Sequence, residues 1–166
     1  MSLSKSILGM GGSMRYARNM AILLACTLML GCAPLSSKHP TRAYPDKNHP
    51  LSDTAVFSCA DVPGIKCSIV SVDYVSTWTH FDGGRTLWVR VLPGARHLTV
   101  VATNGRLINR LSFDVENVQP SHAYAISIDN NGPAMTVVYK DLGKMDSYSL
   151  QMTSWGSHKT NVTAHF

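Results

Sequence analysis

The sequence predicts an all-β domain, an antiparallel sandwich of about seven strands. From residue 54 onward, apolar residues recur with a period of two in short runs. Glycine, proline and asparagine separate these runs about every ten residues, as expected for strands joined by tight turns. No apolar stripe at helical spacing lasts longer than about two turns. Charged residues make up 15 % of the 166-residue chain, too few for a coiled coil or a charge-rich disordered chain.

The earlier predicted strands flank the dipeptide Pro93-Gly94. In residues 67–74 two sets of side chains alternate between the faces: Cys67, Ile69, Ser71 and Asp73 against Ser68, Val70, Val72 and Tyr74. Strands at residues 87–91 and 98–102 follow, and Pro93-Gly94 turns the chain between them, because proline presets φ and glycine accepts the positive φ of a type II turn. We interpret His97 as an imidazole bonded to the backbone of this turn, with a ligand or a general base as the alternative.

The later predicted strands begin with the hairpin signal Asn104-Gly105, which introduces a strand over residues 107–116. Asn109 interrupts its apolar face, which consists of Leu107, Leu111, Phe113 and Val115. Strands at residues 124–128 and 135–139 complete the series. The sandwich is therefore predicted over residues 53–152, and residues 153–166 as a loose polar tail, with Trp155 packing back as the alternative.

Residues 1–31 are predicted to be an export signal. They contain three basic residues and no acid, and residues 21–30 form an uncharged, predominantly apolar run. That run is too short to span a bilayer, which needs about 20 residues. Without the segment, 12 basic residues stand against 10 acidic ones, so the net charge falls from +5 to +2 and gives no argument for nucleic acid binding. Translation starts at Met1 or at Met14.

The end of this segment, residues 28–32 with Gly31-Cys32, resembles the lipobox of bacterial lipoproteins. The resemblance implies cleavage before Cys32 and attachment of diacylglycerol and a further acyl chain such as palmitate. These chains anchor a protein stably in a membrane, since each buried CH₂ contributes about 0.8 kcal/mol. Neither Ala33 nor Pro34 is the aspartate that retains enterobacterial lipoproteins in the inner membrane, so the implied location is the outer membrane, facing the periplasm. An ordinary secretory signal with a stray cysteine is the alternative.

Residues 32–52 are predicted to be a lipidated tether. Four of the eight prolines of the chain fall in this segment, which has no apolar periodicity. Proline removes backbone donors and favours extended conformations, so we interpret the segment as a spacer outside the fold.

Two cysteines, Cys59 and Cys67, remain beyond the predicted lipidation site. In an exported protein, oxidation favours a disulfide between them, and Pro63-Gly64 suits a turn that brings the chain back. A metal site needs more ligands than this pair, and a redox motif would place its cysteines two residues apart.

The strand-turn-strand segment 89–100, together with residues 111–116 and 123–126, is similar to the PEGA domain and to other small β-domains of envelope lipoproteins. These families share a Pro-Gly strand pair and a later strand with an aromatic residue near its start, here Tyr124. The resemblance covers residues 66–140 and implies an immunoglobulin-like or transthyretin-like sandwich. It implies no activity. Pro120-Ser121-His122 stands where such families usually carry glycine.

No catalytic or metal site is predicted, and the expected protein is not an enzyme and holds no cofactor. Ser121 and His122 are neighbours in sequence, so they would point to opposite faces of a strand. Asp114 and Glu116 alternate on the polar side of their strand and are interpreted as a solvated face. The seven histidines are scattered, without the spacings that converge ligands on a metal.

Trp78, His80 and Phe81 form the predicted recognition loop, because they precede Asp82-Gly83-Gly84 between two strands. Burial of Trp78 under the sheet edge is the alternative. The expected function is that of a non-catalytic, membrane-anchored interaction module that binds an envelope protein or peptidoglycan, and not nucleic acid. A lipoprotein that binds a small ligand or a metal is the alternative.

Overall fold

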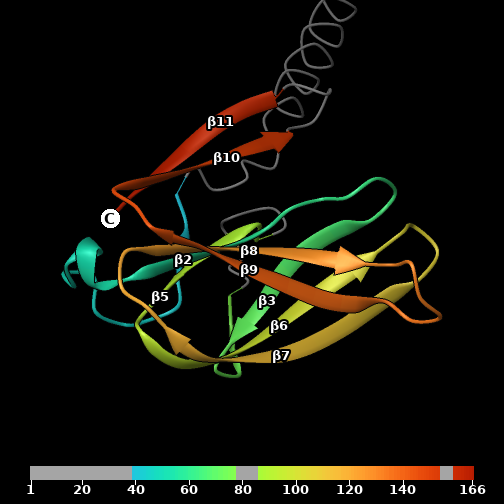
Figure 1. Ribbon diagram of the computed structural model, residues 1–166, viewed down its shortest axis with the longest axis horizontal. Helices are drawn as coiled ribbons and strands as arrows, with labels where there is room; N and C mark the ends of the chain where they lie inside the picture. Colours follow the sequence, from blue (N-terminus) through green and yellow to red (C-terminus); the bar gives the residue numbers. More distant parts are fainter. Residues whose placement is uncertain (1–38, 78–85, 154–158) are drawn as a thin grey trace, which may run out of the picture. The chain divides into compact units, whose positions relative to one another are not determined.

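The computed structural model describes residues 39–77, 86–153 and 159–166, which are almost entirely β-structure (Figure 1). The predicted all-β class is confirmed. In order, the strands are β1 Thr41–Arg42, β2 Ala55–Cys59, β3 Lys66–Val72, β4 Val75–Ser76, β5 Trp88–Val91, β6 Gly94–Thr103, β7 Ile108–Val118, β8 His122–Asp129, β9 Thr136–Lys144, β10 Ser147–Thr153 and β11 Lys159–His165. Among these residues no helix is long and apolar enough to cross a membrane. The predicted signal and Cys32 lie outside the described residues.

Two sheets form the sandwich. The first sheet has the order β1-β5-β2-β8-β9 and the second sheet the order β4-β3-β6-β7. Without the two-residue strands β1 and β4, seven strands remain, as predicted. The second sheet is antiparallel, whereas the first sheet is mixed, because β1 runs parallel to β5 and β2 runs parallel to β8.

The main core lies between the two sheets and contains the inward side chains of both. The ring of Phe57 stacks on that of Tyr124 at 4.6 Å, and Ile69, Leu98 and Ile126 are fully buried around them. The hydroxyl of Tyr124, near the start of β8, accepts a hydrogen bond of 2.9 Å from the backbone N–H of Gln119. This bond back to the preceding loop is the geometry of a tyrosine corner, a feature of Greek-key sandwiches.

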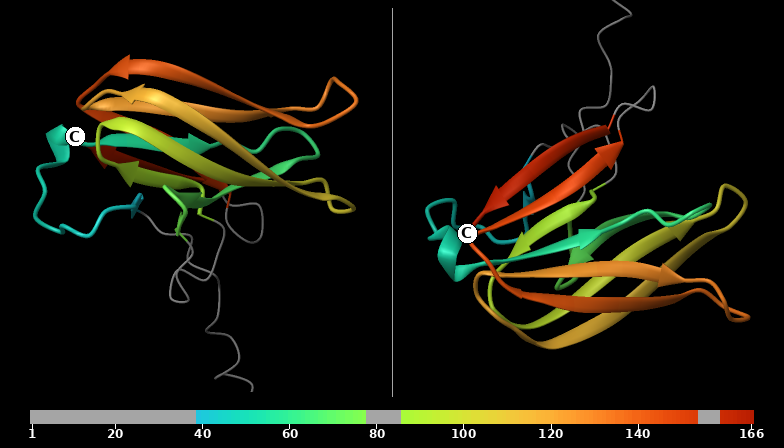
Figure 2. Two further views of the ribbon diagram at one scale, coloured as in Figure 1. Left: turned by 90° about the horizontal axis from the view of Figure 1, so that it is seen from below. Right: turned by 45° about the horizontal axis from the view of Figure 1, so that its top comes forward.

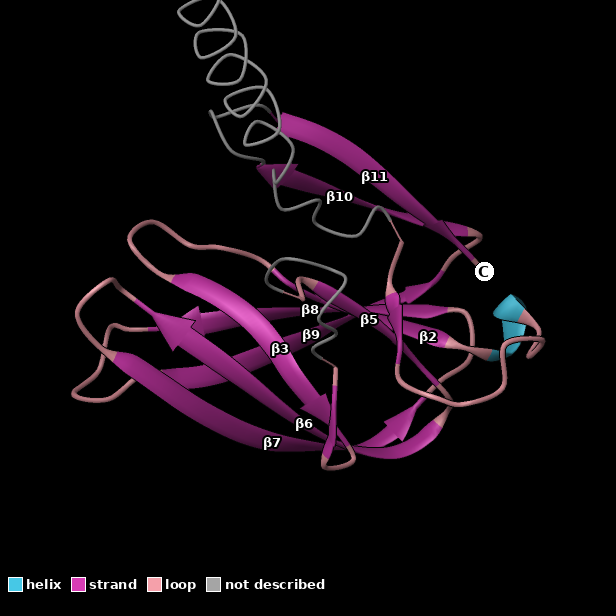
Figure 3. Cartoon of the chain, turned by 180° about the vertical axis from the view of Figure 1, so that it is seen from behind, coloured by secondary structure: helices cyan, strands magenta, loops and turns pink. Residues whose placement is uncertain are grey.

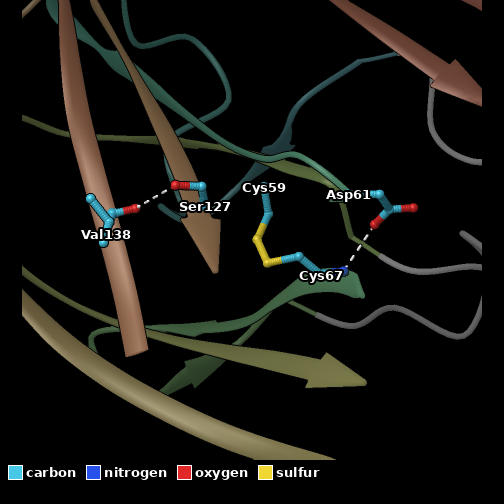
Figure 4. The surroundings of a disulfide bond; sticks show 5 residues. All are labelled: Cys59, Asp61, Cys67, Ser127 and Val138. Carbon is cyan, nitrogen blue, oxygen red and sulfur yellow. Dashed lines mark hydrogen bonds between the residues drawn. A yellow bond between two sulfur atoms is a disulfide. The ribbon is translucent and has the colours of Figure 1, made fainter. Parts of the chain in front are cut away.

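A disulfide joins the two sheets. Cys59 ends β2 and Cys67 lies near the start of β3, with their Cα atoms 5.6 Å apart, and both residues are buried (Figure 4). The backbone N–H of Cys67 also donates to the carboxylate of Asp61 at 2.9 Å. Gly64 has φ +77° in the turn between them. The predicted pair is thus found at disulfide distance, beside the Pro-Gly turn.

The C-terminal segment differs from the predicted loose tail. Strands β10 and β11 form an antiparallel hairpin, here called the C-terminal hairpin, which lies over the first sheet (Figure 2). Met152 and Val162 of this hairpin pack with Val56 and Trp88 in a second apolar cluster. The hydroxyls of Ser58 and Tyr148 lie 2.7 Å apart and add a polar contact. The alternation in β11 rests on two apolar residues, Val162 and Ala164, which explains its weak sequence signal.

Arg90 ties three parts of the chain together while only 4 % of it is exposed. Its guanidinium donates one hydrogen bond to the Thr54 hydroxyl and one to the backbone carbonyl of His165, each 2.7 Å long. The guanidinium carbon also lies 5.4 Å from the centre of the Phe166 ring, a cation–π distance. Burial lowers the pKa of Arg90, because the interior solvates its charge less well than water.

The fold begins before residue 53, so the prediction of a tether up to residue 52 is wrong for its second half. Strand β1 pairs with β5, and the backbone N–H of Ala43 donates to the carbonyl of Arg90 at 2.9 Å. Tyr44 is buried, and Leu51–Asp53 forms one turn of 3₁₀ helix. Prolines at 40, 45 and 50 are compatible with this arrangement, because all three lie outside the two residues of β1 and take no N–H group from its pairing with β5.

Candidate functional site

An open groove of about 590 Å³ lies on the outer face of the second sheet. Strands β3, β6 and β7 run side by side beneath it, and β4 flanks β3 (Figure 3). The volume falls within the range of about 300–1,000 Å³ that is typical of ligand sites. The lining residues are Val70, Ser71, Tyr74, Ser76, His97, Thr99, Arg110 and Ser112.

Strand alternation places polar side chains in the groove. In β6 and β7, Leu98, Val100, Leu111 and Phe113 point into the core, so the residues between them point outward. The register pairs Thr99 with Ser112, and their hydroxyls lie 2.9 Å apart across the two strands. The floor of the groove is therefore a surface of hydrogen-bonding groups.

A β-bulge in β3 shapes the other side of the groove. Ile69 pairs with Val100 and Ser71 pairs with Thr99, so Val70 is an extra residue that faces outward. The bulge also moves Val72 to the core side, where it is buried with Cys67 and Ile69. The predicted strict alternation of residues 67–74 is wrong at this point, because an inserted residue reverses the faces that follow.

His97 lies at one end of the groove. Its Nδ1 atom is 2.7 Å from a carboxylate oxygen of Asp114, and its ring stacks on that of Tyr74 with 4.5 Å between centroids. The turn-backbone bonds expected of His97 are instead made by Arg96, which donates to the carbonyls of Leu92 and Pro93. Gly94 has a φ of +101°, the positive value that the predicted turn requires of its glycine. Asp114 was interpreted as solvated and is exposed, but it also orients His97.

Tyr74 comes from a strained turn between β3 and β4. Asp73 and Tyr74 have φ values of +48° and +64°, a region that non-glycine residues rarely occupy. The Asp73 carboxylate holds this turn against β6 by accepting from the backbone N–H of His97 at 2.9 Å and from Arg96 at 3.0 Å. Tyr74 is nevertheless 82 % exposed, so the turn presents its ring to solvent.

Arg110 supplies the unneutralised charge of the groove. Arg96 is paired with Asp73, and His97 contacts Asp114. Within residues 39–77, 86–153 and 159–166, no carboxylate forms an ion pair with the exposed Arg110. The Arg110 end of the groove is therefore cationic, whereas at the other end the lining residue His97 contacts the carboxylate of Asp114, which lies beside the groove.

The predicted recognition residues Trp78, His80 and Phe81 lie outside the described residues. The described residues on either side of this segment are anchored to β3. Thr77 donates through its N–H to the carbonyl of Val70 and through its hydroxyl to that of Ile69, and the carbonyl of Thr86 accepts from the N–H of Ile69. Thr77 and Thr86, the flanking residues, are thus held at the bulge that lines the groove.

Ser121 and His122 make separate contacts. The Ser121 hydroxyl donates to the carbonyl of Ser52 at 2.7 Å, while Nδ1 of His122 lies 3.0 Å from Asp141. Burial raises the pKa of the Asp141 carboxyl, but hydrogen bonds from the Gly143 N–H and from His122 outweigh it, so the pKa is lowered overall. In the part of the chain that the structure describes, no three side chains of His, Cys, Asp or Glu gather as metal ligands do.

Sequence reasoning singled out His97 but missed Tyr74, Arg110 and the hydroxyls as members of one site. A signal was present, because outward positions of neighbouring strands carry serine or threonine. The pairing register was needed to bring them together. In comparisons with known proteins, no family model, curated protein or solved structure matches this chain.

Proposed function

We propose that this chain is a non-catalytic lipoprotein that binds the cell wall through the groove of the second sheet. In this proposal, acyl chains on Cys32 hold it in the outer membrane, facing the periplasm, and peptidoglycan is its partner. The expectation of a lipoprotein comes from the resemblance of residues 28–32 to a lipobox. The binding role comes from the groove.

The composition of the groove is the observation that carries the proposal. Its walls combine several hydroxyls, an arginine and an exposed aromatic ring. Hydroxyls and charged groups can hydrogen-bond the many polar groups of a saccharide, and an aromatic ring offers a flat apolar surface for one face of a sugar ring. A docking site for a globular protein would instead be expected to have an apolar centre.

A pelleting experiment with purified, insoluble peptidoglycan tests this proposal. We expect the detergent-purified protein to sediment with peptidoglycan and the Tyr74→Ala variant to remain in the supernatant. Leu142→Ala is the matched control, because Leu142 is an exposed apolar residue on β9 of the first sheet. Equal sedimentation of all three proteins, or of none, would contradict the proposal.

Intact-mass measurement tests the anchor separately. We expect a mature chain that begins at Cys32 and carries a diacylglycerol and a further acyl chain, and a Cys32→Ser variant without lipid. An unmodified, freely soluble product would overturn the lipoprotein part of the proposal while leaving the groove to be tested by itself.

A further inference from the structure

We infer that the groove selects saccharides that carry a carboxylate, and that Arg110 binds this carboxylate. The inference rests on the proposed function and specifies the ligand class of the same site. The inference also predicts how the saccharide is oriented in the groove: its carboxylate lies at the Arg110 end and its hydroxyls lie at the His97 end.

The distribution of charge along β7 carries the inference. Arg110, Ser112 and Asp114 are successive outward residues of this strand. Arg110 and Ser112 line the groove, and Asp114 lies beside it in contact with the lining residue His97, so the charge changes from positive to negative along the strand. At about 3.3 Å per residue, Arg110 and Asp114 are about 13 Å apart along the strand. A ligand that spans this length meets opposite charges at its two ends.

Arg110 is suited to bind an anion. Its planar guanidinium can donate two parallel hydrogen bonds to a carboxylate, and no described residue competes for it as an ion-pair partner. Arg96, which lies in the turn next to the lining residue His97, is already held by Asp73 and by the turn carbonyls. The anion site therefore falls at Arg110 and not at the turn.

The opposite end of the groove is suited to sugar hydroxyls. Asp114 is an acceptor, held by His97, so it would accept from hydroxyl groups and repel a second carboxylate. Tyr74 stacks on His97 through one face of its ring, and its 82 % exposure leaves the other face open to a ligand. The strained turn that fixes this ring is consistent with a binding role, because such strain is concentrated at functional sites.

Calorimetric titration of the full-length protein in detergent tests the inference, with cellobiouronate, a disaccharide that carries one carboxylate, as the acidic probe and cellobiose as the neutral probe. We expect cellobiouronate to bind at least about tenfold more tightly than cellobiose, and Arg110→Gln to remove most of this difference. Arg106→Gln is the matched control, because Arg106 lies in the β6–β7 turn, is exposed and does not line the groove. It should change the affinity far less than Arg110→Gln.

Equal affinity for the two probes, no binding of either probe, or equal losses in the two arginine variants would overturn the inference. The peptidoglycan experiment is judged separately. If the protein sediments with peptidoglycan but does not distinguish the probes, the inference fails and the proposed function stands. If it prefers the acidic probe but does not sediment, the proposed function fails and the ligand class stands.

Discussion

Reduction of the Cys59–Cys67 disulfide is expected to weaken the attachment between the two sheets. Cys59 ends β2 of the first sheet and Cys67 lies near the start of β3 of the second, so the bond joins both halves of the sandwich at one end. Reduction removes this link and leaves all side chains in place. It is therefore a cleaner perturbation than a substitution, because both cysteines are buried and a smaller residue would leave a cavity.

The number of residues in the loop closed by the disulfide sets the expected loss of stability. The two cysteines are separated by 8 positions in the sequence. The loop-closure relation for a ring of this size gives about 2.5 kcal/mol at 25 °C, which arises because the bond restricts the unfolded chain. With a urea dependence of about 1–3 kcal/mol per molar, the midpoint of unfolding should fall by about 0.8–2.5 M.

Urea unfolding followed by tryptophan fluorescence, with and without a reductant that acts on disulfides, measures this loss. The Cys59→Ala/Cys67→Ala double variant is the control, since reductant should not move its midpoint. If reductant shifts the double variant as much as the parent protein, the effect does not come from this bond. If mass spectrometry confirms reduction and the urea midpoint of the parent protein does not change, the claim that the disulfide stabilises the fold by restricting the unfolded chain is refuted.

Three further predictions concern single side chains. Arg90→Ala should lower the free energy of unfolding by about 2–4 kcal/mol, because the Thr54 hydroxyl and the His165 carbonyl lose the hydrogen bonds that Arg90 donates. A urea midpoint equal to that of the parent protein would contradict this. Asp141→Asn should destabilise by up to about 1 kcal/mol at pH 7. Folding lowers the pKa of Asp141, so the stability difference between the parent and the variant should vanish as the pH falls below about 4 and the carboxylate of the folded parent is protonated. A stability difference that does not change with pH would contradict the lowered pKa. Tyr74→Gly should abolish sedimentation with peptidoglycan, and it should raise the urea midpoint because glycine adopts a positive φ without steric strain. A lower urea midpoint would show that stacking of the Tyr74 ring contributes more to stability than the strain costs.

The parts of the fold that the sequence predicted correctly are those where one face of a strand is buried and the other is solvated. The outward and inward sets of β7 follow the predicted alternation, and Asn109, the interruption, donates to the thioether of Met135 at 3.2 Å. The turns at Gly94 and Gly105 have the positive φ that their dipeptides indicate. At such positions the residue types of a short segment are sufficient to predict its local structure.

The missed elements have a different origin. All five residues of β2, a strand that was not predicted, are buried, because the second sheet covers one face and the C-terminal hairpin the other. A strand buried on both faces shows no alternation, so its sequence lacks the period-two signal. Its covering hairpin was equally hard to predict, because the pairing of β10 with β11 depends on the cluster around Trp88.

The contrast between the two outer faces of the sandwich favours a binding role for the groove. The first sheet buries Val56 and Trp88 beneath the C-terminal hairpin, so that cover stabilises the fold. On the second sheet, the exposed Ser112 and Arg110 can remain in water without cost, and folding gains little from Tyr74, which is 82 % exposed. A non-glycine residue with positive φ costs about 1–3 kcal/mol, and such residues persist where the surroundings hold them. Here Asp73, Arg96 and His97 hold the turn that fixes the Tyr74 ring, so the geometry serves the groove and not the core.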